Sequence, residues 1–120
     1  MNHHTEGIIV HCIDFRFQKI INKWISKHIR PKIFDRVALA GAVKNLRHIL
    51  DQIDISVRLH HVKKVILINH EDCGAYGESG TLQKHIQDLK AARKAIREKY
   101  PDLEIETYYL HLDGAFEITN

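Results

Sequence analysis

The sequence has few of the features that would set it apart from an ordinary globular protein. No apolar run approaches the roughly 18 residues of a membrane-spanning helix, and only two prolines and six glycines occur in 120 residues, so neither a membrane span nor a long linker is predicted. The 18 basic side chains exceed the 15 acidic ones by only three, too few to indicate a nucleic-acid-binding surface. With 44% hydrophobic and 28% charged residues, the composition is typical of a soluble domain.

The length of the chain and its two cysteines indicate how many domains it forms and what the thiols can do. A chain of 120 residues predicts a single domain, residues 1–120, that is large enough to bury a proper core. Residues 1–7 contain no basic region followed by an apolar one, so we expect no signal peptide and a cytoplasmic location. In a reducing compartment Cys12 and Cys73 are not expected to form a disulfide, which leaves them as inert core residues, nucleophiles or metal ligands.

Short apolar runs alternate with longer amphipathic ones, a pattern that indicates strands separated by helices. The last helix begins near Thr81 and stops at Pro101, and Pro31 closes the first. After an Asp113-Gly114 turn, residues 115–118 are expected to return antiparallel. The predicted fold is α/β, with a mostly parallel central sheet of about four parallel strands plus a C-terminal antiparallel strand, flanked by helices. The predicted strands are 7–13, 34–39, 62–69 and 104–110, and the helices are 17–29, 43–60 and 81–100.

Residues able to bind a metal follow two strands that should lie side by side. Cys12 comes after the first strand, and His70 and Cys73 come after the third. In parallel sheets ligands bind beyond the carboxyl ends of the strands, and two thiolates with one imidazole are a ligand set that zinc prefers. The sequence therefore predicts a Zn²⁺ site. A buried, chemically inert role for each thiol and a disulfide between the two are the alternatives.

Asp14 and Arg16 lie two residues apart, where the chain leaves the predicted first strand. The Asp14 carboxylate could bind the metal itself, as a fourth ligand in a closed state, or accept a hydrogen bond from a water there. A charge-assisted bidentate contact with Arg16 would keep it ionised and off the metal. The alternative is an ordinary surface ion pair.

The two motifs together resemble those of the β-class carbonic anhydrases. Residues 12–16 match Cys-x-Asp-x-Arg and residues 70–74 match His-x-x-Cys-Gly. More weakly, residues 37–41 and 110–114 resemble other segments of that family, so that the resemblance covers about residues 8–118. It implies Cys12, His70 and Cys73 as zinc ligands and Asp14 with Arg16 as the catalytic dyad. It also implies reversible hydration of CO2 to bicarbonate by a zinc lyase, and a homodimer or higher homo-oligomer whose substrate pocket lies between subunits.

Some positions depart from the family pattern. Ile13 and Phe15 stand where the family usually has serines beside the aspartate, and Leu39 stands where it commonly has asparagine. These changes leave the predicted metal site intact but alter the approach to it. Hydrolysis of COS or CS2 at the same zinc is therefore an alternative activity. A non-catalytic, zinc-stabilised binding or regulatory module is another, although Arg16 favours an enzyme because a purely structural site needs no group to draw Asp14 away from the metal.

Overall fold

The computed structural model describes residues 3–29 and 33–119. Within these residues five strands form one sheet in the order β2-β1-β3-β4-β5. Four of them run parallel, and β5 pairs antiparallel with β4, which confirms the predicted sheet. The strands are β1 (Gly7–His11), β2 (Phe34–Ala38), β3 (Lys64–His70), β4 (Glu104–Leu110) and β5 (Phe116–Ile118).

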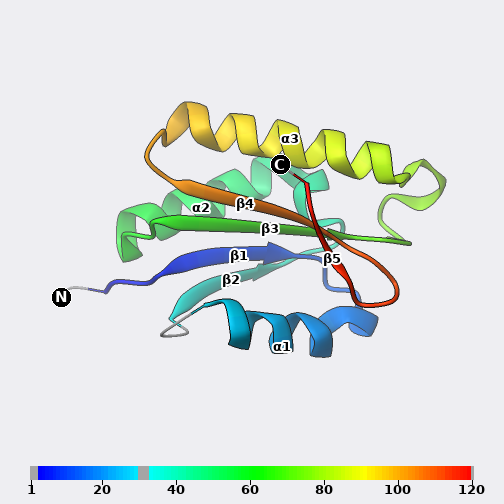
Figure 1. Cartoon of the computed structure of the whole chain (residues 1–120). Coiled ribbons are helices and arrows are strands. Elements are labelled where there is room, and N and C mark those ends of the chain that lie inside the picture. The colour runs from blue at the N-terminus through cyan, green and yellow to red at the C-terminus, as the bar shows by residue number, and fades with distance from the viewer. Residues whose placement is uncertain (1–2, 30–32, 120) are drawn as a thin grey trace.

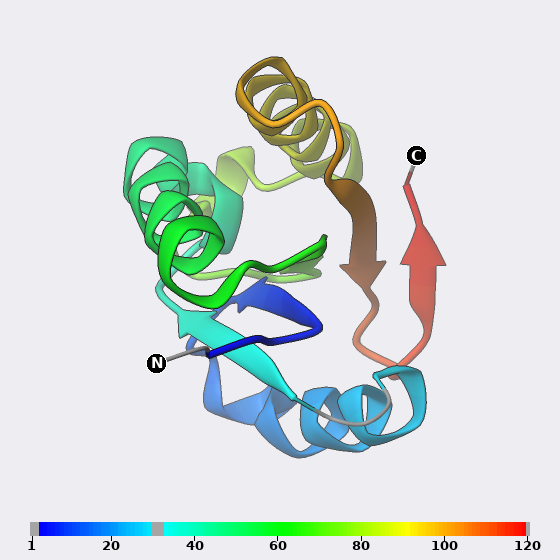
Figure 2. The ribbon, with the colours of Figure 1, turned by 90° about the vertical axis from the view of Figure 1, so that its left-hand side faces the viewer.

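The helices cover both faces of the sheet. Helix α1 (Gln18–His28) lies on one face, whereas α2 (Leu46–His60) and α3 (Leu82–Lys99) lie on the other (Figures 1 and 2). Three 3-10 turns that the sequence pattern did not predict occur in the connections: η1 (Phe15–Phe17), η2 (Ala42–Asn45) and η3 (Gly77–Ser79). The predicted stop at Pro31 falls outside the described residues. No helix within them is long and apolar enough to cross a membrane.

Strand β3 lies at the centre of the sheet and is buried on both faces, as its nearly continuous apolar sequence predicts. Because successive side chains of a strand point to opposite faces of the sheet, those of β3 belong to two different core clusters. Val65 and Leu67 pack with α2 and α3, and Ile66 and Ile68 pack with α1. Packing on both faces holds the sheet in place. It also fixes the positions of the loops that follow the carboxyl ends of the parallel strands.

Helix α3 differs from the expectation in one respect. The helical spacing of apolar residues in the sequence predicts Leu82 on the buried face of α3, but Leu82 is 40% exposed, whereas His85 is fully buried. Leu82 is the first residue of the helix, directly after the Thr81 N-cap, and lies outside the core cluster that Leu89 and Ile96 join. The spacing of apolar residues therefore predicted which face of α3 is buried, but not that this face begins to pack against the core only after Leu82.

The edge strand β5 is attached to α1 by aromatic rings. The Trp24 ring stacks on His28 at 3.9 Å between centroids and on Phe116 at 4.7 Å. The predicted turn between β4 and β5 is present, with Gly114 in the left-handed region at a φ of 93°. This packing holds the short C-terminal strand against α1 at the edge of the sheet.

Candidate metal centre

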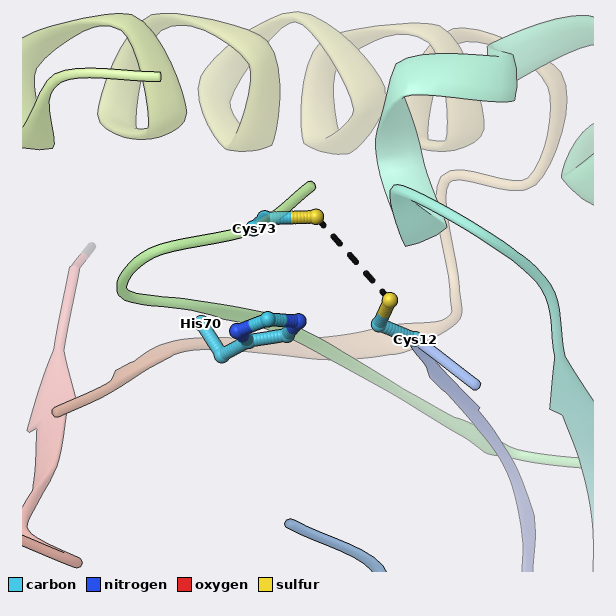
Figure 3. Close-up of side chains that lie close together, drawn as sticks. All are labelled: Cys12, His70 and Cys73. Atoms are coloured by element: carbon cyan, nitrogen blue, oxygen red, sulfur yellow. Dashed lines mark hydrogen bonds between the residues drawn. The ribbon is translucent and has the colours of Figure 1, made fainter. Parts of the chain in front are cut away.

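The sheet brings together the three residues predicted to bind a metal. Strands β1 and β3 pair in parallel, with Val10 opposite Leu67. Cys12 follows β1, His70 ends β3 and Cys73 lies three residues later. All three are buried, and one potential ligand atom from each lies within 4.8 Å of the others (Figure 3).

The arrangement of these atoms fits a tetrahedral metal ion. The two sulfur atoms are 3.9 Å apart, and two metal–sulfur bonds of about 2.3 Å at a tetrahedral angle would separate them by about 3.8 Å. Nδ1 of His70 donates to the Glu71 carbonyl oxygen at 2.7 Å, which leaves Nε2 as the atom with the free lone pair. That buried Nε2 makes no hydrogen bond, a costly state for a polar atom unless another partner, such as a metal, takes the lone pair.

The segment around the ligands turns twice. A glycine directly after Cys73 predicts a turn there, and the structure has one at residues 74–76. Between His70 and Cys73 the chain reverses at Asp72, whose φ is 57°, and aspartate tolerates this left-handed conformation better than most residues. Reversal at Asp72 allows His70 and Cys73 to approach one another. Two backbone N–H groups, of Tyr76 and Gly77, then donate to the Cys73 carbonyl oxygen at 3.1 Å.

The two thiols differ in their electrostatic surroundings. Burial raises the pKa of Cys12, but the interaction with His70 and the N–H of Gly41, 3.4 Å from the sulfur, outweigh it and hold that pKa below the usual value. Burial raises the pKa of Cys73. Without a cation, the site therefore favours one thiolate over two, and a bound dication would favour both.

Asp14 and Arg16 form the predicted bidentate pair at the edge of this site. Nη2 of Arg16 donates to Oδ2 of Asp14 at 2.7 Å, and Nε donates to Oδ1 at 3.1 Å. These hydrogen bonds lower the pKa of Asp14 to about 2. Oδ2 of Asp14 lies 3.9 Å from Nε2 of His70, so the carboxylate is adjacent to the unsatisfied ligand atom.

Sequence reasoning missed the second partner of Arg16. Nη1 donates to Oδ2 of Asp72 at 3.0 Å, and Nη2 donates to the Asp72 backbone oxygen at 2.9 Å. Arg16 therefore connects Asp14 to the turn that carries His70 and Cys73. The positions of Asp72 between the ligands and of Arg16 beyond the first strand were visible in the sequence, but their contact depends on the left-handed turn.

The site opens to the surface through a cavity of about 560 Å³ that Cys12, Asp14 and Arg16 line together with apolar side chains. Two of the latter, Ile13 and Phe15, are 57% and 86% exposed. A small uncharged molecule would therefore approach the carboxylate and the ligand atoms past an apolar rim.

The fold has close counterparts among solved structures. A carbonic anhydrase from Glaciozyma antarctica superposes with a TM-score of 0.72 at 16% identity, covering 100% of this chain and 85% of that one. Isoform I of the Trichomonas vaginalis β-carbonic anhydrases gives 0.67 at 16% identity, covering 98% and 84%. Tetrameric β-carbonic anhydrases from Sordaria macrospora give 0.57 at 15% identity, covering 98% and 81%. The chain thus has the β-carbonic anhydrase fold.

Sequence comparison identifies the family directly. An uncharacterized protein from Rickettsia bellii is 33% identical over 92% of this chain and 79% of its own length. The family described as "Putative carbonic anhydrase" matches residues 2–120. The chain therefore belongs to this carbonic anhydrase family.

Proposed function

We propose that the protein catalyses the reversible hydration of CO2 to bicarbonate and a proton with a zinc ion bound by Cys12, His70 and Cys73. The observation that carries the proposal is the buried Cys-His-Cys group, with Nε2 of His70 unpartnered and the Asp14–Arg16 pair beside it. A zinc ion in such a site supplies Lewis acidity that makes hydroxide available from water near neutral pH.

The residues around the ligands would prepare the site. The Glu71 carbonyl oxygen, by accepting from Nδ1 of His70, fixes the tautomer and orients the ring. Asp14 is ionised at neutral pH, and Arg16 extends the ionised range further into acid by lowering its pKa to about 2. Its carboxylate would accept a hydrogen bond from a water in the cavity and orient that water toward CO2.

Arg16 would determine whether the carboxylate is free for this task. Its guanidinium binds both oxygens of Asp14, and its contacts with Asp72 fix it in place. A planar fork of this kind holds a carboxylate in one orientation, so Asp14 is kept from turning toward the metal ligands. This pairing favours an enzyme over a binding module in which Asp14 closes the metal site.

A sulfur-containing substrate, COS or CS2, is the second candidate. The exposed Ile13 and Phe15 side chains at the cavity favour it, because they would accommodate a larger and more apolar molecule than CO2. Rates of hydrolysis of COS and CS2, compared with the rate of CO2 hydration on one preparation, distinguish the two.

The test combines metal analysis with stopped-flow measurement of CO2 hydration. We expect about one zinc ion per chain and activity that chelation removes and zinc restores. Cys73→Ser should lose both zinc and stability, because metal binding contributes free energy of folding. Full zinc occupancy in a Cys12→Ala/Cys73→Ala double variant, or a zinc-loaded protein without activity on CO2, would contradict the proposal.

We also propose a homodimer or larger assembly, in agreement with the tetrameric Sordaria macrospora relatives and the exposed apolar side chains beside the cavity. A cytoplasmic location remains a prediction from the sequence.

A further inference from the structure

Asn69 is a buried polar residue directly before the ligand His70. Its exposed fraction is 1%, and neighbouring residues on a strand point to opposite faces of the sheet. His70 contacts Phe17 on the α1 side, with 4.4 Å between ring centroids, so Asn69 points toward α3 and η2. Leu67, two residues earlier, occupies an equivalent position as an ordinary core residue. Packing alone therefore does not explain an amide at position 69, because a buried polar group is costly unless it is satisfied.

The side chain of Asn69 contacts three separate segments. Its Oδ1 accepts from the backbone N–H of Val43 in η2 at 3.4 Å. Its Nδ2 donates to the hydroxyl of Tyr76 at 3.0 Å and to Nδ1 of His85 in α3 at 2.9 Å. One side chain thus connects η2, the loop after Cys73 and α3.

Two of these segments surround the sulfur ligands. Gly41, directly before η2, directs its N–H at the sulfur of Cys12 at 3.4 Å. Tyr76 packs in one buried cluster with Cys12 and Cys73, and its N–H donates to the Cys73 carbonyl oxygen. Asn69 therefore ties the segment that contacts Cys12 to the loop that carries Cys73.

The network is anchored at its outer end. The hydroxyl of Tyr76 donates to Oδ2 of Asp88 at 2.8 Å, and Asp88 pairs with Lys84 at 3.2 Å on the surface of α3. Each member depends on its neighbour, because removing one buried partner leaves another unsatisfied.

We infer that Asn69 is a positioning residue of the metal centre: through Tyr76 and η2 its amide fixes the separation of the Cys12 and Cys73 sulfur atoms. The inference rests on the proposed function in taking these sulfur atoms as metal ligands. Loss of the amide would let the Cys73 loop move relative to Cys12, so that metal binding weakens and the coordination geometry changes while the sheet remains folded.

Cobalt(II) titration tests this inference, since the visible absorption bands of bound Co²⁺ report on ligand geometry independently of activity. The variants are Asn69→Ala and Tyr76→Phe. The matched control is Thr107→Val, which removes a hydroxyl of β4 that is equally buried and that accepts from the hydroxyl of Thr119, directly after β5, at 2.9 Å. Competition with a chromophoric chelator gives the affinity, and far-UV circular dichroism checks the fold.

Asn69→Ala should weaken Co²⁺ binding about 10–100-fold, the range typical of groups that orient metal ligands, and should alter the visible bands. Tyr76→Phe should act in the same direction but less strongly, and Thr107→Val should keep both the wild-type affinity and the wild-type bands. Wild-type affinity and bands in Asn69→Ala, or an equal loss in Thr107→Val, would overturn the inference.

If Asn69→Ala does not fold, Tyr76→Phe decides, and unchanged binding in that variant overturns the inference. A wild-type protein that binds no metal would overturn this inference and the proposed function together. Metal binding by the wild type with no change in Asn69→Ala would overturn the inference alone.

Discussion

Arg16 binds two aspartates that lie 58 residues apart, and its replacement therefore tests directly how Asp14 is held in the proposed mechanism. Because its guanidinium is the partner of Asp14, Arg16→Ala should free that carboxylate to turn toward the metal ligands. We expect CO2 hydration to fall about 10–100-fold with zinc retained. Arg16→Lys should rescue activity only in part, since an ammonium group offers a point charge instead of a planar fork. Hydration rate and zinc content are measured on the same sample.

The control for this prediction is another arginine–aspartate pair of the molecule. Arg58 donates to Asp54 at 3.0 Å on the surface of α2, and Arg58→Ala should leave hydration unchanged. If Arg16→Ala keeps its activity and its zinc, Asp14 and Arg16 form an ordinary surface ion pair.

At the residue scale, the sequence predicted which three side chains would meet but not what holds them in place. Cys12, His70 and Cys73 could be grouped because parallel strands present their carboxyl ends at one edge. The contacts of Asp72 and Asn69 could not be predicted in the same way. They depend on a left-handed turn and on the depth at which α3 packs, and neither follows from a local pattern.

Helix α3 begins with a side-chain cap that offers a clean measurement of local stability. The hydroxyl of Thr81 accepts from the backbone N–H of Lys84 at 3.1 Å. Thr81→Ala should lower the free energy of unfolding by about 1 kcal/mol, because an N–H of the first turn loses its partner. Thr81→Ser keeps a hydroxyl and should stay close to wild type. Urea unfolding of the three proteins makes the comparison, and equal stability of all three would show that the cap contributes nothing.

Asp54 links α2 to the end of α3 and should make stability depend on acid pH. Hydrogen bonds from Tyr100, Arg58 and Lys99 lower the pKa of Asp54 to about 2, from a usual value of 3.8. A lowered pKa in the folded state means that the stabilisation is complete above the usual pKa and is lost as pH falls toward 2. Between pH 4 and pH 3 the wild type should therefore lose more stability than Asp54→Asn. Parallel slopes of unfolding free energy against pH would contradict this.

At the element scale, hydrophobic periodicity predicted the three α-helices and the four parallel strands of the described residues with small errors at the ends, and the Asp113-Gly114 turn predicted β5. Strand β3 begins at Lys64 instead of Val62, because Val62 is buried in the core before the chain pairs with its neighbours. The 3-10 turns were missed because three or four residues are too few to show a period.

The exposed rim of the cavity provides a prediction for the whole molecule. Phe15 is 86% exposed, an unusual state for so large an apolar ring beside a proposed active site. If subunits meet here, Phe15→Glu should shift the protein toward monomers by burying a charge in the contact. Leu59→Glu replaces another apolar side chain, 56% exposed on α2, and serves as the control. Sedimentation velocity at micromolar concentration decides, and a wild-type monomer would contradict the proposed assembly.

Trp24 is the single tryptophan of the chain, so tryptophan fluorescence reports on one place only, the packing of α1 against the ends of β4 and β5. Its stacking on Phe116 would be lost if the three-residue edge strand separated from the sheet. Far-UV circular dichroism, by contrast, is dominated by the long helices on the opposite face. A fluorescence transition at a lower urea concentration than the circular dichroism transition would therefore measure fraying of this edge, and it would not measure the stability of the domain.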